Sequence, residues 1–368
     1  MKRYIMYHIM KLIQIKGSVY PDGAIMKMAE YFVKFRGLQS VLHKIHHRNI
    51  RMVCYHMVKD VSTSYYPPNI TTDVFREQIR YLKNNYEIIS VKEALERIKQ
   101  GDKLHRALSI TTDDGFAEDY SVTAPILAEE KVTATFFVTS NCLDNKQLMW
   151  RNKVMHIQNK LEPAKLYSMM NRLAREFRLA APAGTKDLLT WSYFDWSMQH
   201  KEMLSDRLWE MAGLEPISEW LTENRPYLTV GQIKELQHNG FHIGAHTKTH
   251  PFCDRLSYAE LKEEVLGSID HLSSTLQSNI DVLAYPFGAR PTHEMEQRLI
   301  REHADKISGL FGLQYSISNK RNPYAWDRDT MPANYNQSVL KLSVMGIKRK
   351  LLKTIGMLHA VFFVANIV

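Results

Sequence analysis

The chain has 368 residues, 45% hydrophobic and 24% charged, so it can form a full globular core and is not disordered, collagen-like or held together by disulfides. Its formal net charge of +9 is concentrated at the ends: residues 1–52 hold ten Lys or Arg and two acids, and residues 341–368 hold five Lys or Arg and no acid. The body between them is left at about −4. A nucleic-acid-binding domain carries its basic stripe on the folded body, so nucleic acid is not an expected partner.

The two basic ends allow contact with an anionic membrane surface, or they are simply solvated helices. Apolar residues recur at helical spacing over 24–47 with lysines between them, which predicts a basic amphipathic helix within an N-terminal segment, 1–50. The sequence shows no signal-peptide pattern and no uncharged apolar run of 18 residues, and its three cysteines give no disulfide framework. We therefore expect a cytoplasmic protein, held at the inner face of the membrane by its two basic ends.

From residue 51 strands and helices alternate, which is typical of parallel βα units. The strands are expected at 52–58, 88–91, 107–112, 132–138, 241–245 and 282–285, and the helices at 72–84, 91–100, 120–130, 229–239 and 257–276. Residues 141–226 break this rhythm because they are helical and rich in tryptophan, and we interpret them as an insertion over one face of the body. The sequence thus predicts one domain over 51–340, followed by a basic amphipathic tail, 341–368.

Two acids follow the predicted strand 107–112, in Thr-Thr-Asp113-Asp114-Gly. Adjacent carboxylates repel each other, and each raises the pKa of the other. A cation bound to one of them would remove much of this cost and leave the second free to act as a base. The alternative is a simple turn, for which Asp-Gly is common.

Two histidines, His246 and His250, follow the strand 241–245. Pro251 disfavours a helix at His250, and the glutamate of the zinc-protease motif is absent. Because parallel strands bring their carboxyl ends together, the histidines and the acids are expected to meet there. Two histidines and one carboxylate make a divalent metal site with open positions, with Cys253 as an alternative ligand. The pair could also be incidental.

A third cluster, Ala-Tyr-Pro-Phe-Gly over 284–288, indicates only a turn when taken alone. Together, Thr-Thr-Asp-Asp-Gly, His-Thr-Lys-Thr-His-Pro and Tyr-Pro-Phe-Gly resemble the motifs of the polysaccharide deacetylase family, also called the NodB-homology or carbohydrate esterase 4 type. The resemblance runs from about residue 51 to 333, interrupted by the insertion. It implies a distorted (β/α) barrel with fewer than eight strands.

The resemblance also implies roles for individual residues. Asp113 would be the general base, and Phe287 would offer its backbone N–H to the oxyanion. Tyr285 and Phe287 would shape the sugar-binding groove. The ligands of a divalent metal, zinc in the first place with cobalt or nickel as alternatives, would be Asp114, His246 and His250.

The sequence departs from the common family pattern at the general acid, because no late Leu-x-His motif lies on a convincing strand. His56 ends the first predicted strand and resembles an early Tyr-His motif found in one subgroup, whose strand order is circularly shifted. We expect His56 to be the acid, with a buried structural histidine as the alternative. Arg328 resembles the arginine that pairs with the catalytic aspartate, although Asp327 and Arg328 could also be an ordinary surface pair.

The sequence therefore predicts a metal-dependent hydrolase that removes acetyl groups from N-acetylated sugars of a polysaccharide or glycan precursor. An O-acetyl polysaccharide esterase on the same site and an inactive glycan-binding protein are the alternatives. The tryptophans of the insertion would stack on sugars or, for most of them, be buried in the insertion's own core. The sequence specifies neither the sugar, nor the metal, nor the oligomeric state.

Overall fold

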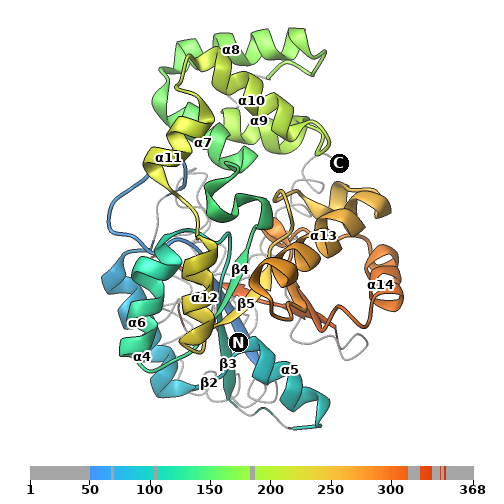
Figure 1. Cartoon of the computed structure of the whole chain (residues 1–368). Coiled ribbons are helices and arrows are strands. Elements are labelled where there is room, and N and C mark those ends of the chain that lie inside the picture. Colours follow the sequence, from blue (N-terminus) through green and yellow to red (C-terminus); the bar gives the residue numbers. More distant parts are fainter. Residues whose placement is uncertain are drawn as a thin grey trace, which may run out of the picture.

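A computed structural model describes residues 50–67, 70–102, 104, 106–182, 187–313, 324–333, 340 and 344 (Figure 1). The predicted N-terminal helix, most of the basic tail and the membrane contact assigned to these ends lie outside the described residues. Among the helices described, none combines membrane-spanning length with sufficient apolar character.

The centre of the molecule is a nearly closed parallel barrel of the predicted type, although the order of its described strands contains eight where fewer than eight were expected. Its strands follow the order β8-β7-β6-β5-β4-β3-β1-β9, and β2 pairs with β3. They are β1 (Arg51–Tyr55), β2 (Glu87–Ile88), β3 (Ala107–Thr112), β4 (Thr135–Val138), β5 (His242–Ala245), β6 (Val282–Ala284), β7 (Gly309–Gly312), β8 (Ala325–Asp327) and β9 (Asp329–Thr330).

One short segment closes the barrel. Arg328 alone separates β8 from β9, and the two strands pair with different partners: Asp327 with Gly312 of β7, and Asp329 with Val53 of β1. Residues 325–330 therefore act as one interrupted strand between β7 and β1. The first and last strands are therefore neighbours, which the assignment of His56 as the acid presupposes.

Most predicted elements are present close to their expected bounds, and the differences lie at their ends. β1 stops at Tyr55 rather than at residue 58, and the helix expected over 120–130 begins with a π-helical turn, Asp119–Thr123. The helices around the barrel are α4 (Thr72–Asn85), α5 (Val91–Lys99), α6 (Ala124–Glu129), α12 (Val230–His238), α13 (Tyr258–Leu276) and α14 (His293–Glu302). Side chains cap several of these helices: Ser257 and Glu260, for example, form a reciprocal capping box at the start of α13.

The two faces of each strand contribute to different cores, because successive side chains point to opposite sides. In β3, Leu108 and Ile110 pack under the outer helices, whereas Ala107 belongs to the core inside the barrel. In β6 the same alternation directs Leu283 outward and Ala284 inward. This alternation decides which residues beyond a strand can reach the site.

The insertion lies over one end of the barrel (Figure 1). Its helices are α7 (Trp150–Lys160), α8 (Pro163–Glu176), α9 (Leu188–Asp195), α10 (Lys201–Ala212) and α11 (Ile217–Asn224). They share one apolar core, which also takes in barrel-loop residues such as Tyr66 and Phe116. This core buries the tryptophans Trp150, Trp191, Trp196, Trp209 and Trp220.

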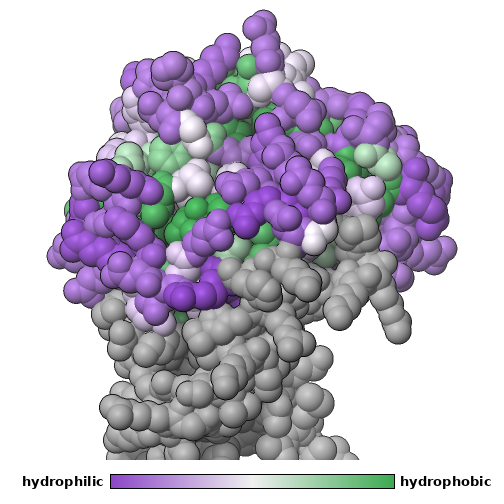
Figure 2. Space-filling view, turned by 90° about the horizontal axis from the view of Figure 1, so that it is seen from below, coloured by the Kyte–Doolittle hydropathy of each residue, from purple (hydrophilic) through white to green (hydrophobic). Residues whose placement is uncertain are grey.

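The side of the barrel opposite the insertion is mostly hydrophilic around an apolar area (Figure 2). A cavity of about 390 Å³, bordered by His242 and Asp281, opens where β5 and β6 begin. The residues singled out by the sequence follow the opposite ends of the strands, so this cavity is not their site.

Candidate active site

The predicted site residues come from separate strands but meet at one end of the barrel. Asp113 and Asp114 follow β3, His246 follows β5, and Phe287 lies in the turn after β6. Parallel strands place their carboxyl ends on the same side of the sheet, where barrel sites form. His56 follows β1, and Arg328 joins β8 to β9.

Asp114, His246 and His250 form a buried cluster of possible metal ligands. Their ligand atoms all lie within 4.8 Å of one another. Asp114 Oδ1 lies 3.0 Å from His250 Nε2 and 3.4 Å from His246 Nε2. Cys253 is not a member of this cluster; it is buried in the main core, with Sγ directed to the Pro251 carbonyl.

The chain adopts unusual backbone conformations to bring these ligands together. Asp114, Thr247 and His250 have φ angles of 80°, 64° and 58°, in the left-handed region that non-glycine residues rarely occupy. Gly115 follows with φ +75°, and a Cβ there would lie 3.0 Å from a methyl group of Val138. Backbone strain of this kind is concentrated at functional sites.

Several contacts hold the histidine loop in this conformation. Glu264 of α13 accepts hydrogen bonds from the backbone N–H groups of Lys248 and Thr249, both at 2.9 Å. The indole of Trp150 donates to the His250 carbonyl at 2.9 Å. The loop is therefore fixed from both the barrel and the insertion.

The donor set fits a divalent cation. His246 Nδ1 lies 2.8 Å from the Ala284 carbonyl; a proton on Nδ1 leaves the Nε2 lone pair free for a metal. Burial lowers the pKa of His250 to about 4, so this imidazole is neutral at pH 7. Burial alone would raise the pKa of Asp114, but the adjacent imidazoles of His246 and His250 hold it well below its ordinary value. Two imidazoles and one carboxylate are suitable ligands for zinc.

Asp113 has a different partner. Arg328 donates two hydrogen bonds to its carboxylate, at 2.6 and 2.7 Å, and a third to Thr111 Oγ1 at 2.9 Å. The pair is buried, with Arg328 1% exposed, and is not the surface pair considered from the sequence. Burial by itself would raise the pKa of Asp113, but Arg328 holds it at about 2.

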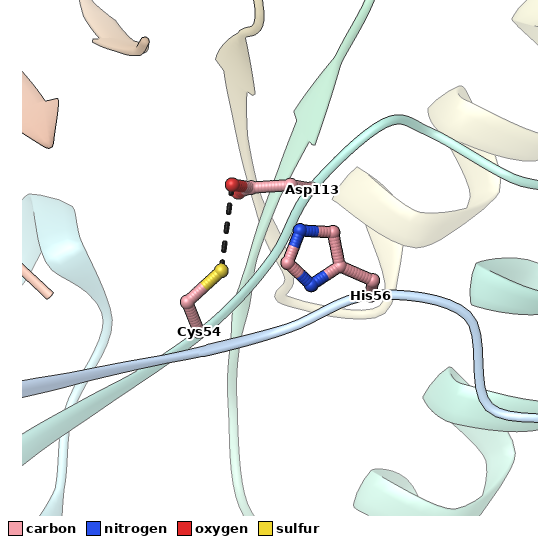
Figure 3. Close-up of side chains that lie close together, drawn as sticks. All are labelled: Cys54, His56 and Asp113. Atoms are coloured by element: carbon pink, nitrogen blue, oxygen red, sulfur yellow. Dashed lines mark hydrogen bonds between the residues drawn. The ribbon is translucent and has the colours of Figure 1, made fainter. Parts of the chain in front are cut away.

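His56 and Cys54 lie beside Asp113 (Figure 3). The Cys54 thiol donates to Asp113 Oδ2 at 3.4 Å, and burial raises the pKa of this thiol, which stays protonated. Burial also lowers the pKa of His56, against the opposite effect of the Asp114 and Asp113 carboxylates, so the imidazole is neutral at pH 7. Cys54 was not among the predicted site residues, although its spacing of two from His56, which directly follows β1, indicates a shared face.

The residues of the turn after β6 lie on different sides of the barrel wall. The ring of Phe287 contacts that of His250, with 4.7 Å between centroids, and stacks on Phe252 at 4.0 Å. Tyr285, in contrast, is 0% exposed in the core beneath the outer helices, so its predicted place in the sugar groove disagrees with the structure.

The insertion contributes side chains that the sequence did not single out. Arg151, the second residue of α7, lies with its guanidinium carbon 5.0 Å from the centre of the Tyr66 ring and 6.0 Å from that of Phe287. Its Nε donates to the Tyr193 hydroxyl at 2.5 Å. No sequence signal marks Arg151, because its approach to the site depends on how the insertion folds back.

Comparison with known proteins supports the family resemblance. The polysaccharide deacetylase family model matches residues 216–301, and no curated protein is a significant match. The Streptococcus pyogenes deacetylase PplD, solved with acetate, is 17% identical, with a TM-score of 0.53 over 80% of this chain and 98% of its own.

Two further structures are similar. IcaB from Ammonifex degensii is 16% identical, with a TM-score of 0.52 over 82% of this chain and 97% of its own. A de-N-acetylase from Aggregatibacter actinomycetemcomitans is 16% identical, with a TM-score of 0.52 over 80% of this chain and 98% of its own. Likeness at such identities establishes the shared fold, and the matched family model adds the sequence evidence. The chain therefore shares the fold of these solved deacetylases, and residues 216–301 match the polysaccharide deacetylase family model.

Proposed function

We propose that this protein is a metal-dependent deacetylase that hydrolyses the N-acetyl groups of amino sugars in a polysaccharide or glycan precursor. The observation that supports it most is the convergence of Asp114, His246 and His250 beside the ionised Asp113. These three residues would hold a divalent cation, zinc in the first place with cobalt or nickel as alternatives. When bound there, the cation would polarise the acetyl carbonyl and lower the pKa of a water molecule.

The residues around the cation would carry out the proton transfers. Asp113, ionised at neutral pH, would accept a proton from the attacking water, while Arg328 keeps its carboxylate in place. Because a carboxylate of pKa about 2 is a weak base, this transfer depends on a water whose own pKa has been lowered. The backbone N–H of Phe287 would donate to the oxyanion that develops on the acetyl oxygen.

His56 would protonate the departing amine as the bond between the acetyl carbon and the nitrogen breaks. Its imidazole is neutral at pH 7, so it must first take up a proton. The ligand atoms of His56 and Asp113 lie within 4.8 Å, and transfer of a proton from Asp113 to His56 would restore the base and charge the acid. The products are acetate and a free amino sugar.

The direct test is acetate release by metal-stripped protein, with and without added zinc, from N-acetylglucosamine oligomers. Zinc should restore activity to the wild type. His246→Ala should be inactive and should bind zinc weakly. Asp113→Asn should keep zinc affinity within a fewfold and lose on the order of 10² or more in kcat.

The outcome also separates the alternatives. Release from acetylated xylan alone would replace the amide substrate by an ester and favour the O-acetyl esterase. Saccharide binding without acetate release from either substrate would favour the glycan-binding protein. Unchanged turnover in Asp113→Asn would remove Asp113 as the base.

We further propose that the basic ends, 1–50 and 341–368, contact anionic lipid, because they carry the excess of positive charge in the chain. Co-sedimentation with vesicles containing an anionic phospholipid should be strong at low salt and weaken as salt rises. Binding to neutral vesicles that is equally strong and independent of salt would contradict an electrostatic contact.

A further inference from the structure

Arg151 reaches the candidate active site from the insertion and lies between aromatic side chains. Tyr66 and Phe287 lie near its guanidinium, and Tyr193 accepts a hydrogen bond from Nε. Phe287 also contacts His250, so a single ring separates the arginine from a predicted metal ligand. The guanidinium is thus held in place before any substrate arrives, which reduces the entropy lost on binding.

This cation lacks a direct counterion. No carboxylate in the described ranges lies within ion-pair distance of Arg151. Asp114, whose charge acts on Arg151, lies instead against the imidazoles of His246 and His250. Asp113 is neutralised by Arg328. With a divalent cation on the triad, the charges around the site would sum to a positive value.

An arginine in this environment is suited to one class of ligand. A planar guanidinium binds carboxylate and phosphate groups through two parallel hydrogen bonds, and such charge-assisted bonds are stronger than those to neutral hydroxyls. Nε donates to the Tyr193 hydroxyl and the guanidinium also interacts with the Tyr66 side chain, but the group has five N–H donors, so donors remain for a ligand. An anion bound to them would supply the missing counterion.

We propose that Arg151 is a specificity-determining residue that binds a carboxylate or phosphate group of the substrate, so that the preferred substrate is an acidic N-acetylated saccharide. This inference rests on the proposed deacetylase function for the position of the acetyl group. The anionic group would lie on the same sugar or on its neighbour. A neutral N-acetylglucosamine polymer would then be a poor substrate.

The test compares three saccharides of equal length with zinc-loaded protein. They are neutral N-acetylglucosamine oligomers, oligomers in which N-acetylglucosamine alternates with glucuronic acid, and N-acetylglucosamine oligomers bearing a terminal phosphate. KM and kcat are measured for the wild type, Arg151→Gln and Arg151→Lys. Arg172→Gln, an equal change of charge at an exposed position of α8, is the control. Calorimetric binding of each saccharide to the metal-stripped proteins gives a second readout that needs no turnover.

Arg151→Gln should raise KM and Kd for an acidic saccharide about tenfold or more, as expected for loss of a charge-assisted hydrogen bond, with little change in kcat. Arg151→Lys should recover part of the lost affinity for the acidic saccharide, and Arg172→Gln should match the wild type. Whether the glucuronic acid oligomer or the phosphorylated oligomer loses affinity in Arg151→Gln shows whether the bound group is a carboxylate or a phosphate. A wild type without preference for acidic saccharides, or an equal loss on neutral ones, would overturn the inference and leave the deacetylase intact. If an acidic saccharide binds in a way that depends on Arg151 but no acetate is released, the proposed deacetylase function is overturned instead. If there is neither Arg151-dependent binding nor acetate release, the inference and the proposed function are both overturned.

Discussion

The adjacent acids Asp113 and Asp114 have different partners, which is why we propose different roles for them. The carboxylate of Asp113 is engaged by Arg328, whereas Asp114 faces His246 and His250. Successive residues beyond β3 point in different directions, and the left-handed conformation of Asp114 turns its side chain toward the histidines. This geometry supports the proposal that Asp113 is the base and Asp114 a metal ligand.

The Asp113 carboxylate should make stability depend on acid. Burial opposes its ionisation, but Arg328 holds its pKa at about 2, below the ordinary 3.8. The unfolded chain therefore binds the proton more readily, and this carboxylate contributes stability above about pH 4 that is lost as the pH falls toward 2. In urea unfolding of metal-stripped protein between pH 6 and pH 3, the wild type should lose about 1 kcal/mol more than Asp113→Asn.

Asp254→Asn is the matched control, because Asp254 is an exposed carboxylate of the same type. It should follow the wild type across this pH range. If Asp113→Asn shows the same acid dependence as the wild type, Arg328 does not hold the pKa of Asp113 below its ordinary value.

The alternation of side chains also shows what could have been predicted for single residues. Tyr285 follows Ala284, an inward residue of β6, so its outward direction was implicit in the strand that the sequence predicted. The same alternation places Cys54 on the face of His56. Arg151 is different, because nothing local indicates that the start of α7 returns to the site.

At the scale of elements, the sequence predicted well the longer strands and helices, which have strong periodicity and clear caps. It did not predict β7, β8 or β9. β7 has four residues bounded by Gly309 and Gly312, and β8 and β9 have three and two, too few to show a pattern. These short strands are stabilised by pairing with their neighbours in the barrel, and local sequence alone does not specify them. Arg328 is buried next to Asp113 only when the barrel is closed.

The insertion helix α7 should affect metal binding through Trp150. Its indole donates to the carbonyl of His250, whose left-handed conformation directs the imidazole to the site. Trp150→Phe keeps an aromatic ring but removes this donor, and loss of such a supporting contact should weaken zinc binding about tenfold. Competition with a chromophoric chelator measures this affinity.

Trp191→Phe is the control, since Trp191 is also buried in the insertion and donates to a backbone carbonyl, that of Ala180. It should lose similar stability and keep the zinc affinity of the wild type. Equal zinc affinity in both variants would mean that the insertion covers the site without shaping its ligands.

At the scale of the whole molecule, the insertion is joined to the barrel by a shared core. Tyr66 and Phe116 from barrel loops are buried together with Trp150 and Trp220, and the rings of Tyr65 and Trp220 meet edge to face at 5.4 Å. The contacts of Phe287 and His250 with this layer place the site at the junction. Unfolding of the insertion alone would expose barrel residues and dismantle the histidine loop.

We therefore predict that barrel and insertion unfold together. Five of the six tryptophans belong to the insertion, so tryptophan fluorescence reports mainly on that part, whereas far-ultraviolet circular dichroism reports on all helices and strands. In urea the two signals should give coincident transitions in metal-stripped protein, the signature of one cooperative unit. Zinc should shift both midpoints upward equally, because a ligand that binds only the folded state stabilises everything that unfolds with its site. A fluorescence transition that precedes the dichroism change and does not respond to zinc would show that the insertion unfolds independently of the barrel. The contact between Trp150 and His250 could not then hold the histidine loop in place.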